Sequence, residues 1–328
     1  FMQLVILMGF IWMSFFDPTQ DLLLLAYLAI LIAFASASQD VAIDAYRIEI
    51  IENKYQAAMA ASYQLGYRIS ALTSGAGALY LAGFYSWQTT YQIMSGFMLV
   101  GIVTVLIIAE SPKTEVIIEK AHWFRSSVIE PFFEFFKRNS LWSFVLIIYI
   151  AIYRVSDLIL GIVANPFYID IGFNLNEIAT VTKVFGFAIT IIGAFVGGIS
   201  VARYGISKPL ILSSILLAGT NLFFLLLNNA GPDLSVLVLT ISADNFALGF
   251  SGSVFIAFLS SLTNRYYTAS QYALFTSIMF LPGIIMSGFS GQIIDAMGWA
   301  KFFIFAASMG IPSILFSLLI VKKGWQEQ

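Results

Sequence analysis

The feature that most constrains this chain is a series of apolar segments, each close to or above the length that crosses a lipid bilayer. A transmembrane helix needs about 20 mainly apolar residues. Hydrophobic residues make up 59% of the 328 residues and charged residues only 10%, whereas soluble domains are about 25% charged. Ten such segments run over residues 1–16, 22–48, 57–84, 91–109, 141–164, 178–201, 210–227, 234–259, 273–297 and 302–321. The sequence therefore predicts an all-α integral membrane protein with about ten transmembrane helices.

The basic residues of the connections predict its orientation. Of the 16 Lys and Arg residues, twelve fall in connections on one side of the membrane, Lys301 falls on the other side, and three lie inside segments. Cytoplasmic loops are enriched in Lys and Arg, so we expect the C-terminus and the long polar connection to be cytoplasmic. This connection divides the chain into an N-terminal bundle (1–110), an inter-bundle loop with an amphipathic helix (111–140) and a C-terminal bundle (141–328).

Charged side chains inside the segments indicate where the function lies. A charge at the bilayer centre costs about 2.5–3.5 kcal/mol on insertion scales, and such residues usually mark a substrate, ion or proton path. Seven ionisable residues fall well inside the segments: Asp40, Asp44, Arg68, Arg154, Asp157, Lys183 and Asp244.

The spacing of these charges leaves alternatives open. Asp40, Asp44 and Arg47 share one helix face, but Asp44 and Arg47 could instead lie in water just past the helix end. Arg154 and Asp157 are three residues apart and could form a purely structural pair. Lys183 could extend to the membrane interface.

Two further positions are expected to line a cavity. Arg68 lies in an aromatic and amide-rich stretch that includes Gln64, which suits sugar or peptide binding. Asp244 forms, with Ser242 and Asn245, a short polar stretch within an apolar segment.

A weak internal repeat relates the two halves of the chain. The stretches that begin at Asn53 and Asn264 match at an offset of 211 residues, whereas Ser38 with Asp40 and Ser242 with Asp244 match at an offset of 204. Paired glycines in the second half, among them Gly193 with Gly197 and Gly249 with Gly252, predict helices that approach one another closely.

Several motifs resemble one known family. They are Gln-Asp-Val-Ala-Ile-Asp-Ala-Tyr-Arg at 39–47, Gly-Tyr-Arg at 66–68, Tyr-Arg-x-x-Asp at 153–157 and Lys-x-x-Gly at 183–186. Together they resemble the AmpG muropeptide permeases and their acetyl-CoA-transporter relatives, within the major facilitator superfamily. The resemblance implies a fold of twelve helices in two bundles that rock about a central cavity. The chain would then carry helices 3–12, with the first two absent.

One motif departs from the superfamily pattern. The loop at 198–208 resembles the superfamily's Gly-x-x-x-Asp-Arg-x-Gly sequence, but Ala202 stands where Asp is usual.

The same resemblance implies the function: a bacterial inner-membrane permease, driven by the proton gradient, that imports N-acetylglucosaminyl-anhydro-muropeptides for peptidoglycan recycling. Asp40 and Asp44 are the expected proton-coupling residues, with Asp40 as the carrier and Asp44 paired with Arg47 at a cytoplasmic gate. The resemblance implies an anionic sugar-peptide as the substrate, and we expect a monomer in the lipid bilayer with no nucleic-acid partner. The expected substrate-binding residues are Gln64, Arg68, Arg154, Asp157, Lys183 and Asp244.

Nothing in the sequence indicates an enzyme or a cofactor. Cysteine is absent, the single histidine, His122, lies in the long connection, and no glycine-rich phosphate loop or metal-binding motif occurs. Two alternatives remain: a related carrier of another bulky anion such as an acyl-CoA, or a polytopic enzyme or flippase of cell-wall metabolism.

Overall fold

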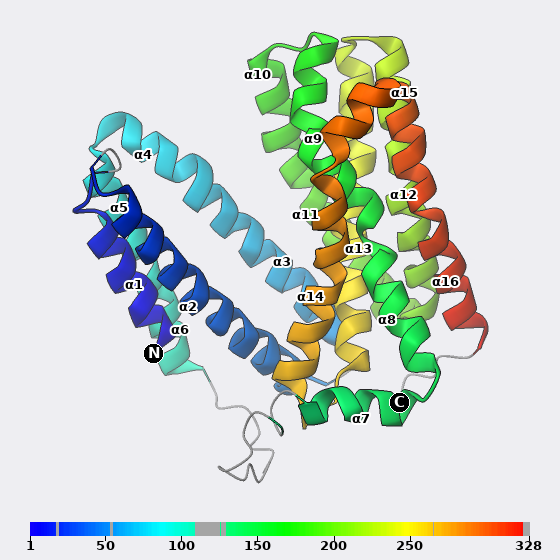
Figure 1. The fold of residues 1–328 in the computed structure, drawn as a ribbon, viewed down its shortest axis with the longest axis horizontal. Helices are drawn as coiled ribbons and strands as arrows, with labels where there is room; N and C mark the ends of the chain where they lie inside the picture. Colours follow the sequence, from blue (N-terminus) through cyan, green and yellow to red (C-terminus); the bar gives the residue numbers. More distant parts are fainter. Residues whose placement is uncertain (18–19, 53–54, 109–124, 126–128, 265, 324–328) are drawn as a thin grey trace. The chain divides into compact units, whose positions relative to one another are not determined.

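A computed structural model describes residues 1–17, 20–52, 55–108, 125, 129–264 and 266–323 (Figure 1). Every regular element within these ranges is a helix. The chain divides into two compact units: residues 1–50 with 66–115, and residues 51–65 with 116–328. Helix α3 (Gln56–Leu72) therefore contributes its first part to the second unit and its last part to the first unit.

In the first unit, α1 (Met2–Met13) packs against its neighbours in the bundle, α2 (Leu22–Glu49), α5 (Trp87–Gly96) and α6 (Met98–Ile107). The end of α3 continues through the π-helical turn η2 (Thr73–Gly77) into α4 (Ala78–Phe84). The chain reverses before α5, which begins where the Ser86 hydroxyl accepts a hydrogen bond from the Thr89 N–H at 3.2 Å. This contact satisfies one of the free amides of the first helical turn.

The second unit holds the remaining helices. A short helix, α7 (Glu130–Asn139), precedes the helical bundle. The bundle comprises α8 (Trp142–Tyr153), α9 (Val155–Ile171), α10 (Leu175–Ile178), the π-helical η5 (Ala179–Phe185), α11 (Gly186–Tyr204), α12 (Ser207–Ala230), α13 (Leu234–Leu262), α14 (Thr268–Ser287), α15 (Ser290–Met309) and α16 (Ile311–Lys322).

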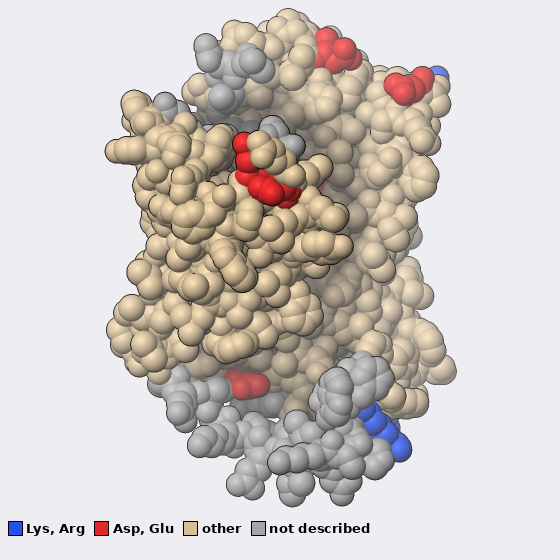
Figure 2. All heavy atoms as spheres, turned by 60° about the vertical axis from the view of Figure 1, so that its left-hand side comes forward, with Lys and Arg blue, Asp and Glu red and all other residues tan. Residues whose placement is uncertain are grey.

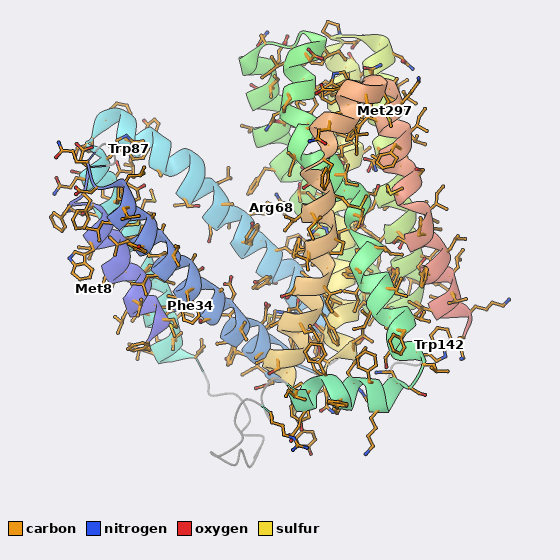
Figure 3. All side chains as sticks on the ribbon, in the orientation of Figure 1. Met8, Phe34, Arg68, Trp87, Trp142 and Met297 are labelled. Atoms are coloured by element: carbon orange, nitrogen blue, oxygen red, sulfur yellow. The ribbon has the colours of Figure 1, made fainter. Side chains whose placement is uncertain are left out.

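Eight helical stretches in the described residues are long and apolar enough to cross a membrane. Two of the ten predicted segments are helical without meeting these criteria: α1 has only 12 residues, and the path from α3 to α4 is less apolar. The last two predicted segments are separated at Gly298, inside α15, where φ is +76°. Glycine adopts this conformation without steric cost, so the chain reverses there, next to Met297 (Figure 3).

Much of the surface is apolar. Figure 2 shows a face on which most of the area carries neither acidic nor basic side chains. Met8, Phe34 and Trp87 of the first unit, labelled in Figure 3, are 59%, 66% and 55% exposed. Water-soluble monomers rarely expose contiguous apolar areas of this extent, whereas lipid tails solvate them.

The core of the second unit has an aromatic cluster where α9, α12 and α15 meet. Phe167 stacks edge-on against Phe303 with ring centroids 4.7 Å apart, and Phe224 lies 5.7 Å from Phe303. All three side chains are buried. Aromatic pairs in this geometry add about 0.5–1.5 kcal/mol beyond the area they bury.

Glycines let α11 and α13 pack backbone to backbone, as the sequence predicts. A Cβ atom at Gly193 would lie 2.3 Å from the Phe246 carbonyl oxygen, and one at Gly249 would lie 2.0 Å from the Thr190 carbonyl oxygen. At Gly252 the close neighbour is instead the side chain of Gln64 on α3.

The amphipathic helix predicted near 128–138 is α7. Phe135 is buried against the unit while Phe133 is 71% exposed. Glu134 pairs with Arg138 at 3.3 Å and accepts a hydrogen bond from Gln271 at 2.6 Å, so α7 is held to the start of α14. Within the predicted loop, residues 111–124 and 126–128 lie outside the described residues.

The two ends of the second unit differ in charge. Arg138 donates to the Leu262 carbonyl at 2.6 Å, and Lys323 lies 4.1 Å from the ring centroid of Trp142, so α7, the start of α8 and the ends of α13 and α16 share one end. Arg203 and Lys208 lie there too, because α12 runs antiparallel to α13. The opposite end carries Asp170, Glu177, Asp233, Asp295 and Lys301.

Candidate functional site

Within the first unit, the charges near the end of α2 form a buried pair. Arg47 is 2% exposed, and its Nε lies 3.6 Å from Oδ1 of Asp44, whose side chain is 17% exposed. The spacing of three residues brings both groups to the same side of the helix. The alternative in which Arg47 lies in water past the helix end is therefore wrong.

Asp40, one turn earlier on α2, has a different environment: its side chain is exposed. It lies nine residues before the last residue of α2, or about 14 Å along the helix axis at 1.5 Å per residue. The structure thus distinguishes a paired carboxylate, Asp44, from an accessible one, Asp40. Their roles as gate and proton carrier stay predictions.

The expected pair on α3, Gln64 and Arg68, is divided between the units. In the second unit, the Gln64 amide donates to the Ser253 hydroxyl at 3.5 Å, and it fills the space left by Gly252 on α13. Gln64 therefore has a packing role beside any role in binding. Arg68 lies four residues later, in the part of α3 that belongs to the first unit, and is partly buried (Figure 3).

Arg154 lies at a break in a membrane-spanning helix. It is the residue between α8 and α9, with φ −103° and ψ 3°, and it stands near the middle of the span Trp142–Ile171. Broken helices at mid-membrane depth are a common way of building transporter sites, because they present polar groups away from water.

The arginine side chain at this break has two contacts. Its Nη2 donates to Oδ2 of Asp157 at 2.5 Å, and its guanidinium lies 5.5 Å from the ring centroid of Phe280 on α14. Both Arg154 and Asp157 retain some exposure, 19% and 16%. The ion pair is thus partly accessible.

Asp244 lies on α13, next to this group. The Thr220 hydroxyl of α12 and the Asp157 carboxylate are the polar groups that act on the Asp244 carboxyl. Asp244 is the eleventh residue of α13, about 15 Å along the axis from Leu234.

The remaining site residue, Lys183, lies on η5. Its backbone belongs to a π-helical turn, a local widening that is frequent at functional sites. The Lys183 side chain lies outside the described residues, so its predicted role stays a prediction.

The structure therefore describes the predicted site residues as two groups. Asp40, Asp44, Arg47 and Arg68 belong to the first unit; Gln64, Arg154, Asp157 and Asp244 belong to the second. Among the described residues, no group of three or more His, Asp or Glu side chains is arranged to hold a metal ion.

Sequence reasoning missed the neutral partners of these charges. Thr220 and Phe280 carry no sequence signal, since threonine and phenylalanine are common in apolar helices. A polar contact between Asn245 and Thr190, 2.8 Å apart, likewise joins α13 to α11. Of these neutral residues, only Asn245 has a sequence signal, as a neighbour of Asp244.

Comparison with known proteins defines the class. The sequence matches the Major Facilitator Superfamily over residues 1–287. The fold is similar to the proton:xylose symporter XylE, with TM-score 0.71, 12% identity, and coverage of 98% of this chain and 78% of that one. It is also similar to the Escherichia coli fucose:proton symporter FucP, with TM-score 0.68, 13% identity, and coverage of 97% and 83%. The protein is a membrane transporter with the superfamily's fold.

Relatives at higher identity narrow the assignment. Transporter AmpG 4 of Rickettsia conorii is 34% identical over 95% of this chain and 76% of its own length. The anhydromuropeptide permease of Escherichia coli K12 is 30% identical over 97% of this chain and 64% of its own length. The chain therefore belongs to the Major Facilitator Superfamily and, within it, to the AmpG family of transporters.

Proposed function

We propose that this protein imports anhydro-muropeptides across the bacterial inner membrane, from periplasm to cytoplasm, driven by protons, for peptidoglycan recycling. The observation that carries the proposal is the similarity to an anhydromuropeptide permease over nearly the whole chain, at 30% identity. At that level the substrate class of a carrier is commonly shared.

The charges inside the helices suit such a substrate. Muropeptides carry carboxylates, and planar guanidinium groups bind carboxylates through two parallel hydrogen bonds. Arg154 offers its guanidinium beside an aromatic ring, Phe280, which is a surface for the apolar face of a sugar or peptide. Arg68 and Lys183 supply further cations on α3 and η5.

Proton coupling is supported by the carboxylates of α2. A coupled carrier needs a carboxyl group that binds a proton on one side of the membrane and releases it on the other. Asp40 meets the requirement for access, since its side chain is exposed while Asp44 is committed to Arg47. We assign proton transfer to Asp40 and gating to the Asp44–Arg47 pair.

The orientation of the carrier in the membrane is supported by the charge asymmetry. The basic end of the second unit faces the cytoplasm under the positive-inside rule, which places the C-terminal end of α16 there. The carrier is expected to act as a monomer with two bundles, 1–110 and 141–328, joined by the loop at 111–140.

Substrate choice is tested with the purified protein in proteoliposomes. Labelled anhydro-muropeptide and labelled acyl-CoA are offered separately, and the internal label is recovered and identified chemically. We expect saturable uptake of unmodified anhydro-muropeptide. Preferred uptake of the acyl-CoA would show that the transported anion is an acyl-CoA and not an anhydro-muropeptide. A chemically altered product would contradict the assignment as a carrier.

A further inference from the structure

We propose that Tyr153 and Ser156 are positioning residues, which fix the break between α8 and α9 so that Arg154 presents its guanidinium to the substrate. The inference rests on the proposed function, since it takes Arg154 to bind a substrate carboxylate. It extends the candidate site to two neutral side chains that flank Arg154 in the sequence.

The backbone at Arg154 is not fixed by a regular helical ladder. Its N–H donates to the Ile152 carbonyl, two residues back, whereas an α-helix would use the carbonyl four residues back. Its carbonyl accepts from the Leu158 N–H at 3.0 Å and so begins the ladder of α9. Arg154 therefore ends one helix and begins the next, and the direction of the break depends on the side chains beside it.

Tyr153, the last residue of α8, is bonded to α12 and α13. Its hydroxyl donates to the Ser213 hydroxyl at 2.8 Å and lies 3.3 Å from the Ser251 carbonyl oxygen. Ser213 donates its own proton to the Leu210 carbonyl at 2.8 Å, so its oxygen accepts the proton of Tyr153. The Tyr153 ring stacks on that of Phe255, with centroids 3.6 Å apart and planes at 8°. These contacts fix the side that precedes Arg154.

Ser156, the second residue of α9, is bonded to α12 and α15. Its hydroxyl donates to the Ala306 carbonyl at 2.8 Å and accepts a hydrogen bond from the side-chain amide of Asn221 at 2.6 Å. Ser156 and Asn221 are both buried. A buried polar group that loses its hydrogen bond costs free energy, so a rotation of α9 that breaks these contacts is disfavoured. The side that follows Arg154 is therefore fixed as well.

The direction of the Arg154 side chain follows from these contacts. With both neighbouring segments fixed, its guanidinium reaches Asp157 and lies against Phe280 of α14 while staying partly exposed. If the break relaxed into a continuous helix, the segment on one side would turn relative to the other. A guanidinium binds a carboxylate through two parallel hydrogen bonds, a contact that depends on its orientation. Such a turn would weaken that contact.

Tyr149 and Ser214 provide a matched comparison, one turn earlier on α8. Their hydroxyls are 3.2 Å apart, and the Tyr149 side chain is buried like that of Tyr153. Tyr149 lies inside the helix that spans residues 142–153, so its backbone is fixed by helical hydrogen bonds. Loss of the Tyr149 hydroxyl should therefore weaken packing without moving Arg154.

Hydrogen exchange of the purified protein tests these contacts without substrate. Tyr153→Phe and Tyr149→Phe each remove one buried hydroxyl, so we expect similar falls in Tm. Faster exchange of the amides at residues 154–158 is expected in Tyr153→Phe only, because local opening of the break exposes them. Equal exchange in the two variants would overturn the proposal. If Tyr153→Phe does not fold, Ser213→Ala and Ser214→Ala, which are adjacent on α12, give the same comparison.

Binding of labelled anhydro-muropeptide to the purified protein tests the role in recognition. We expect Kd to rise about tenfold in Tyr153→Phe, as for the loss of a hydrogen bond to a charged group. Tyr149→Phe should keep the wild-type Kd, and Ser156→Ala should act like Tyr153→Phe. An unchanged Kd in Tyr153→Phe, despite faster exchange, would overturn the role in substrate binding.

A double-mutant cycle tests whether Tyr153 acts through Arg154. In the Arg154→Gln background the carboxylate contact is already lost, so adding Tyr153→Phe should leave Kd unchanged. A further rise in Kd would show that Tyr153 acts by another route and would contradict the positioning role. If the wild type does not bind anhydro-muropeptide, the proposed function fails, whereas the hydrogen-exchange comparison still decides whether Tyr153 fixes the break.

Discussion

At the scale of residues, two ion pairs inside this membrane protein join residues that are close in the sequence. Arg47 with Asp44 and Arg154 with Asp157 are each three residues apart. Partners this close in the sequence meet through local structure alone, so neither charge needs a distant partner to enter the membrane. Such spacing can be recognised in a sequence, and the sequence predicts the contact in both cases.

The neutral side chains that lie beside these charges cannot be recognised from the sequence. Thr220 beside Asp244 and Phe280 beside Arg154 come from other helices, and their positions depend on how the helices pack. The exposures of Asp40 and Arg47 also depend on packing, because helical spacing gives the face of a helix but not what covers it.

Arg68 provides the first prediction. If its guanidinium holds a substrate carboxylate, Arg68→Ala abolishes uptake while the protein still inserts and accumulates. Arg68→Lys recovers uptake only in part, since an ammonium group lacks the two-pronged contact. Uptake is measured in proteoliposomes, with Arg203→Ala at the end of α11 as control. Uptake near the wild-type level in Arg68→Ala removes Arg68 from the site.

The two carboxylates of α2 are predicted to differ in effect. Asp40→Asn should remove accumulation driven by a pH gradient but leave substrate exchange measurable, because exchange needs no net proton movement. Asp44→Asn should reduce both, since it breaks the contact with Arg47. Residual uphill transport by Asp40→Asn would show that Asp40 is not the proton carrier.

At the scale of elements, the apolar segments predicted the helices well but not their interruptions. The break at Arg154 and the π-helical turns η2 and η5 have no apolar pattern of their own.

The bounds of α2 and α13 also decide between the two offsets that the sequence suggests for the internal repeat. α13 begins at Leu234 and ends at Leu262, 212 and 213 residues after Leu22 and Glu49. The offset near 211 therefore describes the repeat, and Asp40 and Asp244 are not equivalent positions.

Close packing of α11 on α13 gives an element-scale prediction. Gly249→Ala places a methyl group against the backbone of Thr190, where no side chain can move aside. Overpacking of this kind typically costs about 1–3 kcal/mol. We expect a clear fall in Tm in detergent. Gly219→Ala on α12, whose Cβ would meet nothing within 4 Å, is the matched control and should leave Tm unchanged or slightly raised. Equal Tm values for the two variants would contradict the packing described here.

At the scale of the whole molecule, the sequence predicted the family and the helical membrane fold, and the comparisons confirm both. The orientation in the membrane stays a prediction that rests on charge. Because the chain has no cysteine, single-cysteine variants at the two ends of α12 test it cleanly. In intact cells, Lys208→Cys should resist a membrane-impermeant maleimide and Asn229→Cys should react. The reverse pattern would overturn the orientation.

The most direct test of the central claim is uphill transport driven by protons alone. Proteoliposomes containing the protein are loaded and diluted so that only a pH gradient, acidic outside, is present, and labelled anhydro-muropeptide is added at equal concentration on both sides. The account predicts accumulation above the outside concentration, which a protonophore abolishes. Equilibration without accumulation, or accumulation that persists with the protonophore, would contradict a proton-driven importer.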